Sequence, residues 1–282
     1  MASLNTYAVN TWCPGCGNFA ILRAIKAVLQ SFEKEGESLN KFVMITGIGC
    51  HGKIADYVNI NSFYTIHGRV TSTATGIKLG NPELKVIGFA GDGDAYGEGL
   101  AHLIFAAKRN IDITMIIHNN RVYGLTTGQF TPTSPFGFKG KSTPFGSLEK
   151  PFNPLELMFS ARATFIARGY STALNNLIYI IKEAIKHKGF ALVDVLQPCF
   201  TFFNTYSYYN QRVYELKDHD PSSREEALKR IKEWDYNSDS KIPIGIFYKE
   251  EKPTFDDLIL SGIIPAKRKR DVNIKEILRK TI

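Results

Sequence analysis

The first two-thirds of the chain alternates between helical and strand-like patterns of apolar positions. After Gly17, apolar residues recur at helical spacing over residues 19–29, and this pattern ends at Gly36. Three short apolar runs follow at residues 42–46, 84–90 and 111–117, and each ends in a loop rich in Gly or Asn. Runs of this length are typical of buried strands, so the pattern predicts an α/β fold.

The connection between the second and third runs indicates how their strands pair. Residues 97–110 are long enough for a crossover helix, which makes this stretch a βαβ unit with parallel strands. We therefore expect three layers, with a mostly parallel sheet covered by helices on both faces. In such sheets ligands bind outside the carboxyl ends of the strands, and this edge is the expected functional site.

The middle of the chain predicts a long loop and a further helix and strand. Residues 130–154 are rich in Pro, Gly, Ser and Thr and show no period, which is typical of a functional or disordered loop. Residues 174–188 predict a helix, and residues 191–196 predict the strand that follows it. Ser222 and Ser223 each begin a possible capping box for a short charged helix.

We divide the chain into a cofactor-binding domain over residues 1–215 and a C-terminal extension over residues 216–282. From Lys252 onward the apolar content is too low for a separate domain, so we expect the extension to pack on a partner subunit.

Composition narrows the class of protein. Of the 282 residues 44% are hydrophobic and 22% are charged, which is typical of a soluble globular protein. The sequence has no apolar run near the roughly 18 residues of a membrane helix, so we expect a cytoplasmic protein with no membrane contact.

The formal net charge of +8 could indicate nucleic acid, but the basic residues are dispersed and no nucleic-acid-binding motif is visible. Only residues 267–270 form a basic run, which is either a solvated tail or a contact for an acidic protein. We expect no nucleic-acid partner.

Polar residues follow two of the predicted strands and form a candidate metal site. Gly91-Asp92-Gly93-Asp94 comes after the second run, and Asn119-Asn120 comes after the third, with Asn120 28 residues beyond Asp92. Mg²⁺ prefers such carboxylate and amide oxygens and completes its shell with phosphate oxygens. A plain strand-to-helix turn could use the same Gly-Asp-Gly, but the spacing to the Asn pair favours a site for Mg²⁺ and a phosphate group.

These two motifs resemble the thiamine diphosphate fingerprint in the form found in β subunits of 2-oxoacid:ferredoxin oxidoreductases. The second motif continues to Gly124 as Asn119-Asn120-Arg121-Val122-Tyr123-Gly124. Further segments match in order through about two-thirds of the chain, namely Trp12-Cys13-Pro14-Gly15-Cys16-Gly17, Gly47-Ile48-Gly49-Cys50, His67-Gly68-Arg69, Ala74-Thr75-Gly76-Ile77-Lys78-Leu79 and Asp194-Val195-Leu196-Gln197-Pro198-Cys199.

The resemblance implies a set of cofactor ligands. Asp92, Asn120 and the main-chain carbonyl of Val122 would hold Mg²⁺. The expected contacts to thiamine diphosphate are Ile48, Gly49, Cys50, His51, His67, Gly68, Gly93, Asp94, Gly124 and Leu125. His51-Gly52 stands where the family is expected to have small hydroxyl residues, so the resemblance does not define the local contacts or the substrate preference at this position.

The four cysteines are a second candidate site. Cys13 and Cys16 form a CxxC motif that alone suits zinc, a redox dithiol or an iron–sulfur cluster, while Cys50 and Cys199 each follow a predicted strand. The residues themselves predict only that the fold gathers four thiolates. The resemblance implies that they hold one 4Fe-4S cluster, and zinc is the alternative.

The resemblance also implies the function and the partners. The chain would be the β subunit of an enzyme that converts a 2-oxo acid and coenzyme A to acyl-CoA and CO₂ and reduces ferredoxin. Lys53 would bind the substrate carboxylate. An α subunit, or a γα fusion, would supply the Glu that activates the cofactor, and two αβ heterodimers could associate. The rival hypotheses are a non-redox thiamine diphosphate decarboxylase or carboligase and a non-catalytic metal-binding scaffold subunit.

Overall fold

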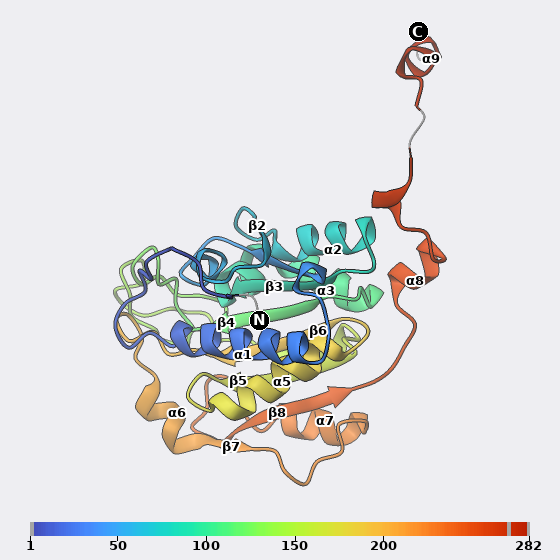
Figure 1. The fold of residues 1–282 in the computed structure, drawn as a ribbon. Helices are drawn as coiled ribbons and strands as arrows, with labels where there is room; N and C mark the ends of the chain where they lie inside the picture. The colour runs from blue at the N-terminus through green and yellow to red at the C-terminus, as the bar shows by residue number, and fades with distance from the viewer. Residues whose placement is uncertain (1–2, 270–271, 281–282) are drawn as a thin grey trace.

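The computed structural model describes residues 3–269 and 272–280 and has the expected α/β architecture (Figure 1). One sheet of eight strands forms its centre, in the order β2-β1-β3-β4-β6-β5-β8-β7. Neighbouring strands run parallel, except that β5 and β8 are antiparallel. The strands are β1 (Phe42–Thr46), β2 (Asn61–Tyr64), β3 (Lys85–Gly91), β4 (Thr114–Asn119), β5 (Phe165–Tyr170), β6 (Ala191–Leu196), β7 (Val213–Glu215) and β8 (Ile242–Lys249).

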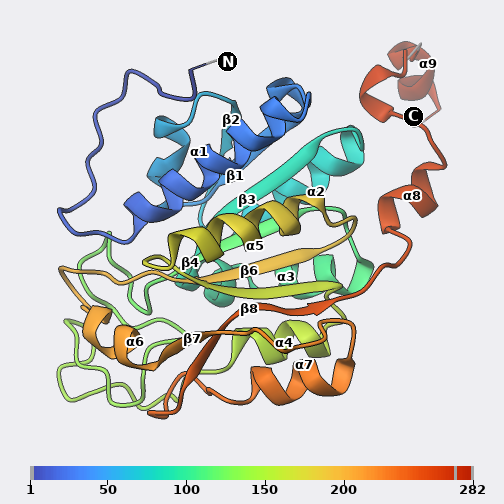
Figure 2. The ribbon, with the colours of Figure 1, turned by 60° about the horizontal axis from the view of Figure 1, so that its bottom comes forward.

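Helices cover both faces of this sheet (Figure 2). One layer consists of α1 (Asn18–Lys34) and α5 (Leu174–Lys186), which pack against each other. The opposite layer contains α2 (Val70–Gly80), α3 (Leu100–Arg109), α4 (Pro154–Ser160) and α7 (Arg224–Ile231). The shorter helical segments are α6 (Tyr206–Arg212), α8 (Phe255–Leu260), α9 (Ile274–Arg279), the 3-10 turns η1 (Leu39–Lys41), η2 (His51–Tyr57) and η4 (Pro265–Lys267), and the π-helical turn η3 (Gly93–Glu98).

The alternation of side chains along each strand explains the two layers. In β3, Ile87 and Phe89 belong to the core beneath α1 and α5, whereas Val86 and Ala90 belong to the core on the opposite face. Because both faces are covered, a central strand needs apolar residues at nearly every position. This requirement is why β1, β3, β4 and β6 are visible in the sequence as continuous apolar runs.

The strand order brings four loops to one edge of the sheet. β1, β3, β4 and β6 are consecutive neighbours and run parallel, so Thr46, Gly91, Asn119 and Leu196 end at the same edge. The loops that follow these strands contain Cys50, Asp92, Asn120 and Cys199. The fold therefore positions both sets of candidate ligands together.

Most of the elements expected from the sequence are confirmed. The crossover between β3 and β4 consists of η3 followed by α3, and residues 130–153 form the expected loop. Ser223 is the N-cap of α7, since its Oγ accepts a hydrogen bond from the Glu226 amide, but the Glu226 carboxylate accepts from the Asp220 amide, so neither predicted capping box is complete. β2, α2, β5 and β8 are absent from the sequence patterns described above.

The sheet extends beyond residue 215, where the C-terminal extension was expected to begin. β8 pairs with both β5 and β7, and most of its side chains are buried, so residues up to 249 belong to the body of the fold. The boundary at 215 is corrected accordingly. It was misplaced because the polar segment around α7 interrupts the apolar pattern before β8.

The chain after β8 leaves the sheet. α8 and η4 lie against α2, and Lys267 forms an ion pair with Glu83, while α9 stands clear of the body (Figure 1). Arg270 of the basic run lies outside the described residues. Within residues 3–269 and 272–280, no helix combines the length and the apolar character that a bilayer crossing requires. Packing of this segment on a partner subunit stays a prediction.

The side chain of Asn110 joins three segments at the opposite edge of the sheet. Asn110 ends α3 in the left-handed conformation, with φ of 51°. Its Oδ1 accepts hydrogen bonds from Thr164 Oγ1 at 2.7 Å and the Phe190 amide at 2.9 Å. Its Nδ2 donates to the carbonyl oxygens of Lys252 and Pro253 at 3.3 and 3.1 Å.

We predict that Asn110→Ala lowers the free energy of unfolding by about 3 kcal/mol or more. The change leaves buried donors and acceptors unpaired, at about 1–3 kcal/mol each, and adds the cost of a left-handed alanine. Asn110→Gly is the matched control, since it loses the same bonds without that backbone cost and should lose less stability. Urea denaturation of the three proteins measures the difference, and an alanine variant as stable as the parent would contradict the prediction.

Candidate active site

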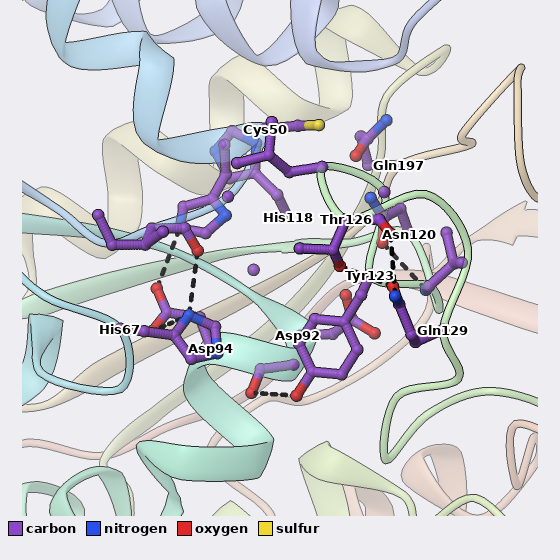
Figure 3. A pocket seen from close by; sticks show the side chains of 18 residues that line it. Cys50, His67, Asp92, Asp94, His118, Asn120, Tyr123, Thr126, Gln129 and Gln197 are labelled. Carbon is purple, nitrogen blue, oxygen red and sulfur yellow. Dashed lines mark hydrogen bonds and ion pairs between the residues drawn. The ribbon is translucent and has the colours of Figure 1, made fainter. Parts of the chain in front are cut away.

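A cavity of about 380 Å³ opens at the carboxyl edge of the sheet, where the four loops meet (Figure 3). Its wall comes from the loops after β1, β3, β4 and β6, together with His67. The three expected Mg²⁺ ligands, Asp92, Asn120 and Val122, all line it. So do nine of the expected cofactor contacts, namely Ile48, Gly49, Cys50, His51, His67, Gly93, Asp94, Gly124 and Leu125.

Asp92 is a buried carboxylate that suits a cation. Its side chain is 1% exposed, and this burial raises its pKa to about 6, although hydroxyl hydrogen bonds from Thr131 and Thr133 lower it in part. Thr133 Oγ1 lies 2.8 Å from Asp92 Oδ2 and 2.9 Å from Asn119 Oδ1. A divalent cation at this carboxylate would favour its charged form, so the residues present fit a magnesium ion.

A buried polar network beneath Asp92 fixes the position of Thr133 and Asn119. Asn119 Nδ2 donates to Asp194 Oδ1 at 3.0 Å. Asp194 also accepts hydrogen bonds from Tyr96 OH at 2.7 Å and Tyr236 OH at 2.6 Å. Arg168, its partner across β5 and β6, is fully buried and donates to Tyr236 OH at 3.3 Å. A continuous series of hydrogen-bond contacts therefore connects Arg168, through Tyr236, Asp194, Asn119 and Thr133, to the candidate metal ligand Asp92.

The loop after β4 is held in a tight conformation that presents Asn120 and Val122. Asn120 Oδ1 accepts a hydrogen bond from the Val122 amide at 3.1 Å. Between them Arg121 has φ of 60°, and its buried guanidinium donates to the carbonyl oxygens of Thr133 and Tyr236. The arginine therefore points into the fold while its two neighbours line the cavity.

Close contacts explain two of the glycines in the motifs. A Cβ on Gly93 would lie 2.2 Å from the ring of Tyr123, and a Cβ on Gly47 would lie 1.8 Å from Asp94 Oδ2. Any larger residue at either position would displace a side chain of the site.

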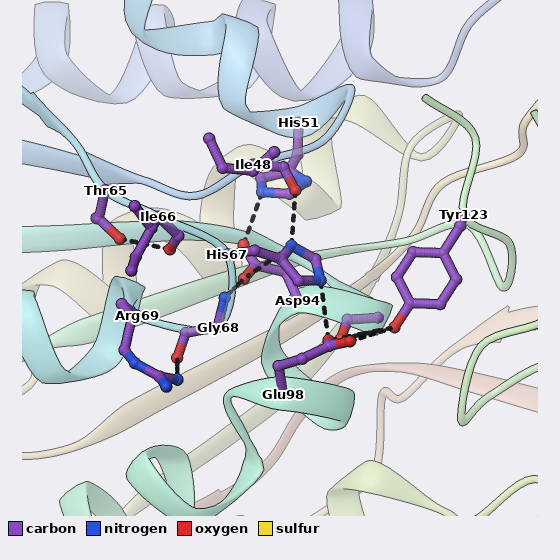
Figure 4. Close-up of polar contacts among 11 residues, drawn as sticks. Ile48, His51, Thr65, Ile66, His67, Gly68, Arg69, Asp94, Glu98 and Tyr123 are labelled. Carbon is purple, nitrogen blue, oxygen red and sulfur yellow. Dashed lines mark hydrogen bonds and ion pairs between the residues drawn. The ribbon is translucent and has the colours of Figure 1, made fainter. Parts of the chain in front are cut away.

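Asp94 organises the wall on the other side of the cavity (Figure 4). It lies 3.0 Å from His51 Nε2 and accepts a hydrogen bond from the Gly68 amide. His67 extends this wall, since its Nδ1 is 3.1 Å from the Ile48 carbonyl and its Nε2 is 2.8 Å from Glu98 Oε2. His51, which departs from the family pattern, is therefore held by the carboxylate of Asp94 in the Gly-Asp-Gly-Asp motif.

The four cysteines line a second, smaller cavity of about 50 Å³ beside the first. All four are free thiols. Burial raises the pKa of Cys16 to about 12; a hydrogen bond from the Asn18 backbone lowers it in part, and the nearby Cys199, Cys50 and Cys13 raise it further. Thiolates this close repel each other in the absence of a cation, so the set fits a metal centre.

Hydrogen bonds fix the segment that contains Cys13 and Cys16. Trp12 Nε1 donates to the Cys50 carbonyl at 2.6 Å, and the Cys16 amide donates to the Cys13 carbonyl at 3.1 Å. The Gly17 amide donates to the Pro198 carbonyl at 3.3 Å. The CxxC turn is therefore connected to the loops of both other cysteines.

The four thiols share a cavity, but they do not converge on a single point. Among the residues that the structure describes, no three His, Cys, Asp or Glu side chains converge closely enough to hold one metal ion. Four thiolates around one zinc, with Zn–S of about 2.3 Å, must lie within about 4 Å of each other. A cluster with one thiolate on each iron accepts a wider arrangement.

Two expected residues lie elsewhere than anticipated. Gly68 does not line the large cavity; its amide donates a hydrogen bond to Asp94, which does. Lys53 lines the cysteine cavity, and its Nζ donates to the Thr11 carbonyl at 3.4 Å. A substrate role for Lys53 stays a prediction, and it requires the side chain to turn toward the large cavity.

Other residues of the site were not assigned a role from the sequence. His118, Thr126, Gln129 and Gln197 also line the large cavity, and the Thr133 hydroxyl contacts the Asp92 carboxylate. Strand alternation could have indicated His118, since it lies near the end of β4, two residues before Asn120. Thr133 lies in the aperiodic loop, where no pattern marks it.

The fold and this pair of loops define the thiamine diphosphate-binding class of proteins. A family model described as "Thiamine pyrophosphate enzyme, C-terminal TPP binding domain" matches residues 47–195. A second family model, which describes the C-terminal part of the pyruvate ferredoxin oxidoreductase β chain, matches residues 198–261.

Named relatives narrow this class. The β subunits of 2-oxoacid:ferredoxin oxidoreductases from Aeropyrum pernix and Saccharolobus solfataricus are 43% and 45% identical to the chain, over 91% and 86% of it and 83% and 82% of their own lengths. A solved structure of 2-oxoglutarate:ferredoxin oxidoreductase from Magnetococcus marinus has a TM-score of 0.86 and 31% identity, over 99% of this chain and 94% of its own. This chain belongs to the family of 2-oxoacid:ferredoxin oxidoreductase β subunits.

We predict that Thr133→Val weakens Mg²⁺-dependent binding of thiamine diphosphate by about 10- to 100-fold. The hydroxyl holds Asp92 in place, and loss of such outer contacts typically costs that much metal affinity. Titration of the assembled enzyme with Mg²⁺, followed by cofactor retention, measures the change. Thr143→Val, in the same long loop but away from Asp92, is the matched control, and Asp92→Ala marks complete loss. Equal affinities in the Thr133 and Thr143 variants would contradict the prediction.

Proposed function

We propose that this chain, together with an α subunit, converts a 2-oxo acid and CoA to acyl-CoA and CO₂ and passes two electrons singly to ferredoxin. The observation that carries the proposal is the wall shared by the two cavities, formed by Cys50, Asn120, Gly124 and Gln197. A cofactor in one cavity and a cluster in the other would be separated by about one layer of side chains. Such proximity favours electron transfer between them.

Asp92, Asn120 and the Val122 carbonyl would hold Mg²⁺, and the ion would bind the diphosphate of the cofactor. Thiamine diphosphate supplies the carbanion that attacks a keto carbon and stabilises the charge left when CO₂ departs. The chain itself would bind the diphosphate end, through the glycines around Asp92 and the amides that open η3. His51 and His67 form the polar wall beside it.

Cys13, Cys16, Cys50 and Cys199 would hold one 4Fe-4S cluster. Their common cavity and their free thiols support a metal centre, and no three of these side chains among the described residues converge on a single ion as zinc would require. These four thiolates would thereby place a one-electron redox centre beside the large cavity, and such a cluster would supply the route for electrons to ferredoxin.

The partners follow from the same proposal. The activating Glu would come from the α subunit or a γα fusion, and residues 250–282 would pack on that subunit or on a second αβ pair. The assembled enzyme would act in the cytoplasm. The Magnetococcus marinus relative was solved with 2-oxoglutarate, coenzyme A and succinyl-CoA bound, which supports CoA as the acyl acceptor. Pyruvate, 2-oxobutyrate and 2-oxoglutarate are the 2-oxo acids to compare.

The decisive experiment is anaerobic co-expression with the α partner, followed by analysis of iron, acid-labile sulfide, zinc and thiamine diphosphate. We expect about four irons and one thiamine diphosphate per chain. We also expect ferredoxin reduction that needs both CoA and a 2-oxo acid. Thiamine without iron would favour a non-redox decarboxylase or carboligase, and neither cofactor would favour a scaffold subunit.

We predict that Cys199→Ser lowers the iron content and bleaches the visible absorbance of the purified enzyme while thiamine diphosphate is retained. The serine hydroxyl is a poorer ligand for iron than a thiolate. Ser171→Ala, also near the end of the sheet, serves as the control and should keep the full chromophore. Unchanged iron in the Cys199 variant would remove this residue from the ligand set.

We predict that Lys53→Met raises the KM for the 2-oxo acid by about 10- to 100-fold, because a charged hydrogen bond to a carboxylate contributes about 1.5–3 kcal/mol. The KM for CoA should stay the same, and it provides the internal control. Steady-state ferredoxin reduction measures both constants. A normal KM for the 2-oxo acid would leave Lys53 with a role on the cysteine side, where its side chain now lies.

A further inference from the structure

Gln197 occupies the boundary between the two cavities. It follows β6, is 1% exposed, and lines both the large cavity and the cysteine cavity. Figure 3 shows its side chain at the margin of the large cavity, near Asn120. A buried amide in this position must direct its donors and its acceptor to different neighbours.

The amide nitrogen of Gln197 faces two acceptors. Nε2 donates to the Pro198 carbonyl at 2.7 Å and lies 3.7 Å from Cys16 Sγ. The amide group has two hydrogens, so each acceptor can receive one. Rotation of the amide by half a turn would bring Oε1 against the carbonyl oxygen and the sulfur, which are both acceptors. The neighbours therefore fix which end of the amide faces the cysteine.

The backbone around Gln197 keeps this contact in place. The Pro198 carbonyl also accepts the Gly17 amide at 3.3 Å, which connects the Cys16 turn to the Gln197 loop. A Cβ on Gly17 would lie 2.9 Å from Gln197 Cγ, so the glycine permits the close approach. Oε1 of Gln197 has no hydrogen-bond partner among the described residues, so no protein donor pulls the amide away from the sulfur.

We propose that Gln197 is a positioning residue that donates an N–H···S hydrogen bond to the Cys16 ligand and raises the reduction potential of the cluster. The proposal rests on the proposed function in that the cysteines hold a 4Fe-4S cluster. One-electron reduction adds a negative charge to the cluster and its sulfurs. A donor at a ligand sulfur stabilises this reduced form more than the oxidised form, and hydrogen bonds of this kind are among the factors that set cluster potentials.

Gln197→Leu removes the donor from a side chain of similar size. In a dithionite titration of the anaerobic αβ enzyme, followed by electron paramagnetic resonance, we expect the ratio of reduced to oxidised cluster at a fixed potential to fall about tenfold. For one electron this ratio corresponds to a potential about 59 mV lower. Ser171→Ala is the matched control, because its hydroxyl lies beside the same Gly17 position but has no hydrogen-bond partner among the described residues. The control should titrate as the parent enzyme does.

Equal potentials in the Gln197→Leu variant and the parent, both with full iron, would overturn the inference. If the variant loses its cluster, the parent enzyme decides the question. With glutamine labelled with nitrogen-15, electron spin-echo modulation of the reduced cluster should reveal a weakly coupled side-chain nitrogen, and its absence would overturn the inference. A parent enzyme without iron would overturn the proposed cluster, and the role of Gln197 with it.

Discussion

The buried carboxylate of Asp194 constrains the whole cofactor edge. It lies in the central strand β6 with no exposure, so its charge requires compensation from the protein. Burial raises its pKa, and hydrogen bonds from Tyr236 and Tyr96 together with the charge of Arg168 oppose that rise. These groups come from η3, β5 and the turn after α7, so elements far apart in the sequence must be in place before the site exists. Asn119, which donates to Asp194, also contacts the Thr133 hydroxyl, and that hydroxyl contacts Asp92, so the position of Asp92 depends on Asp194.

The parallel sheet explains why two kinds of chemistry meet at one edge. Four neighbouring strands end side by side, and their loops contribute an oxygen-rich cavity and a sulfur-rich one. Hard oxygen ligands suit magnesium, whereas thiolates suit iron. The N-terminal segment completes the second cavity, because Trp12 and Gly17 bond to the loops of Cys50 and Cys199. Neither cavity could be built from one loop alone.

The sequence predicted the parts of this arrangement that depend on local pattern. Central strands appear as apolar runs because both their faces are buried, and Asp92 and Asn120 stand out because glycines and fixed spacing surround them. β8 was missed because an antiparallel strand after a polar helix has no crossover rule to place it. Three residues were not assigned roles because their partners are distant in the sequence. Thr133 contacts Asp92, 41 residues away, and Arg168 contacts Tyr236, 68 residues away. Gln197 contacts Cys16, 181 residues away. Such contacts depend on tertiary structure.

Gly124 lines both cavities, so a substitution there would affect the candidate ligands of both centres. A Cβ at this position would lie 3.6 Å from Cys50 Sγ and 3.7 Å from both Asn120 Nδ2 and Cys199 Sγ. An alanine would fit in ordinary contact, but a larger side chain would press on ligands of both candidate centres at once. Variation at this residue is therefore pleiotropic, because a change that suited one candidate centre would disturb the candidate ligands of the other unless a second change compensated. The two centres are expected to coevolve as one unit of selection.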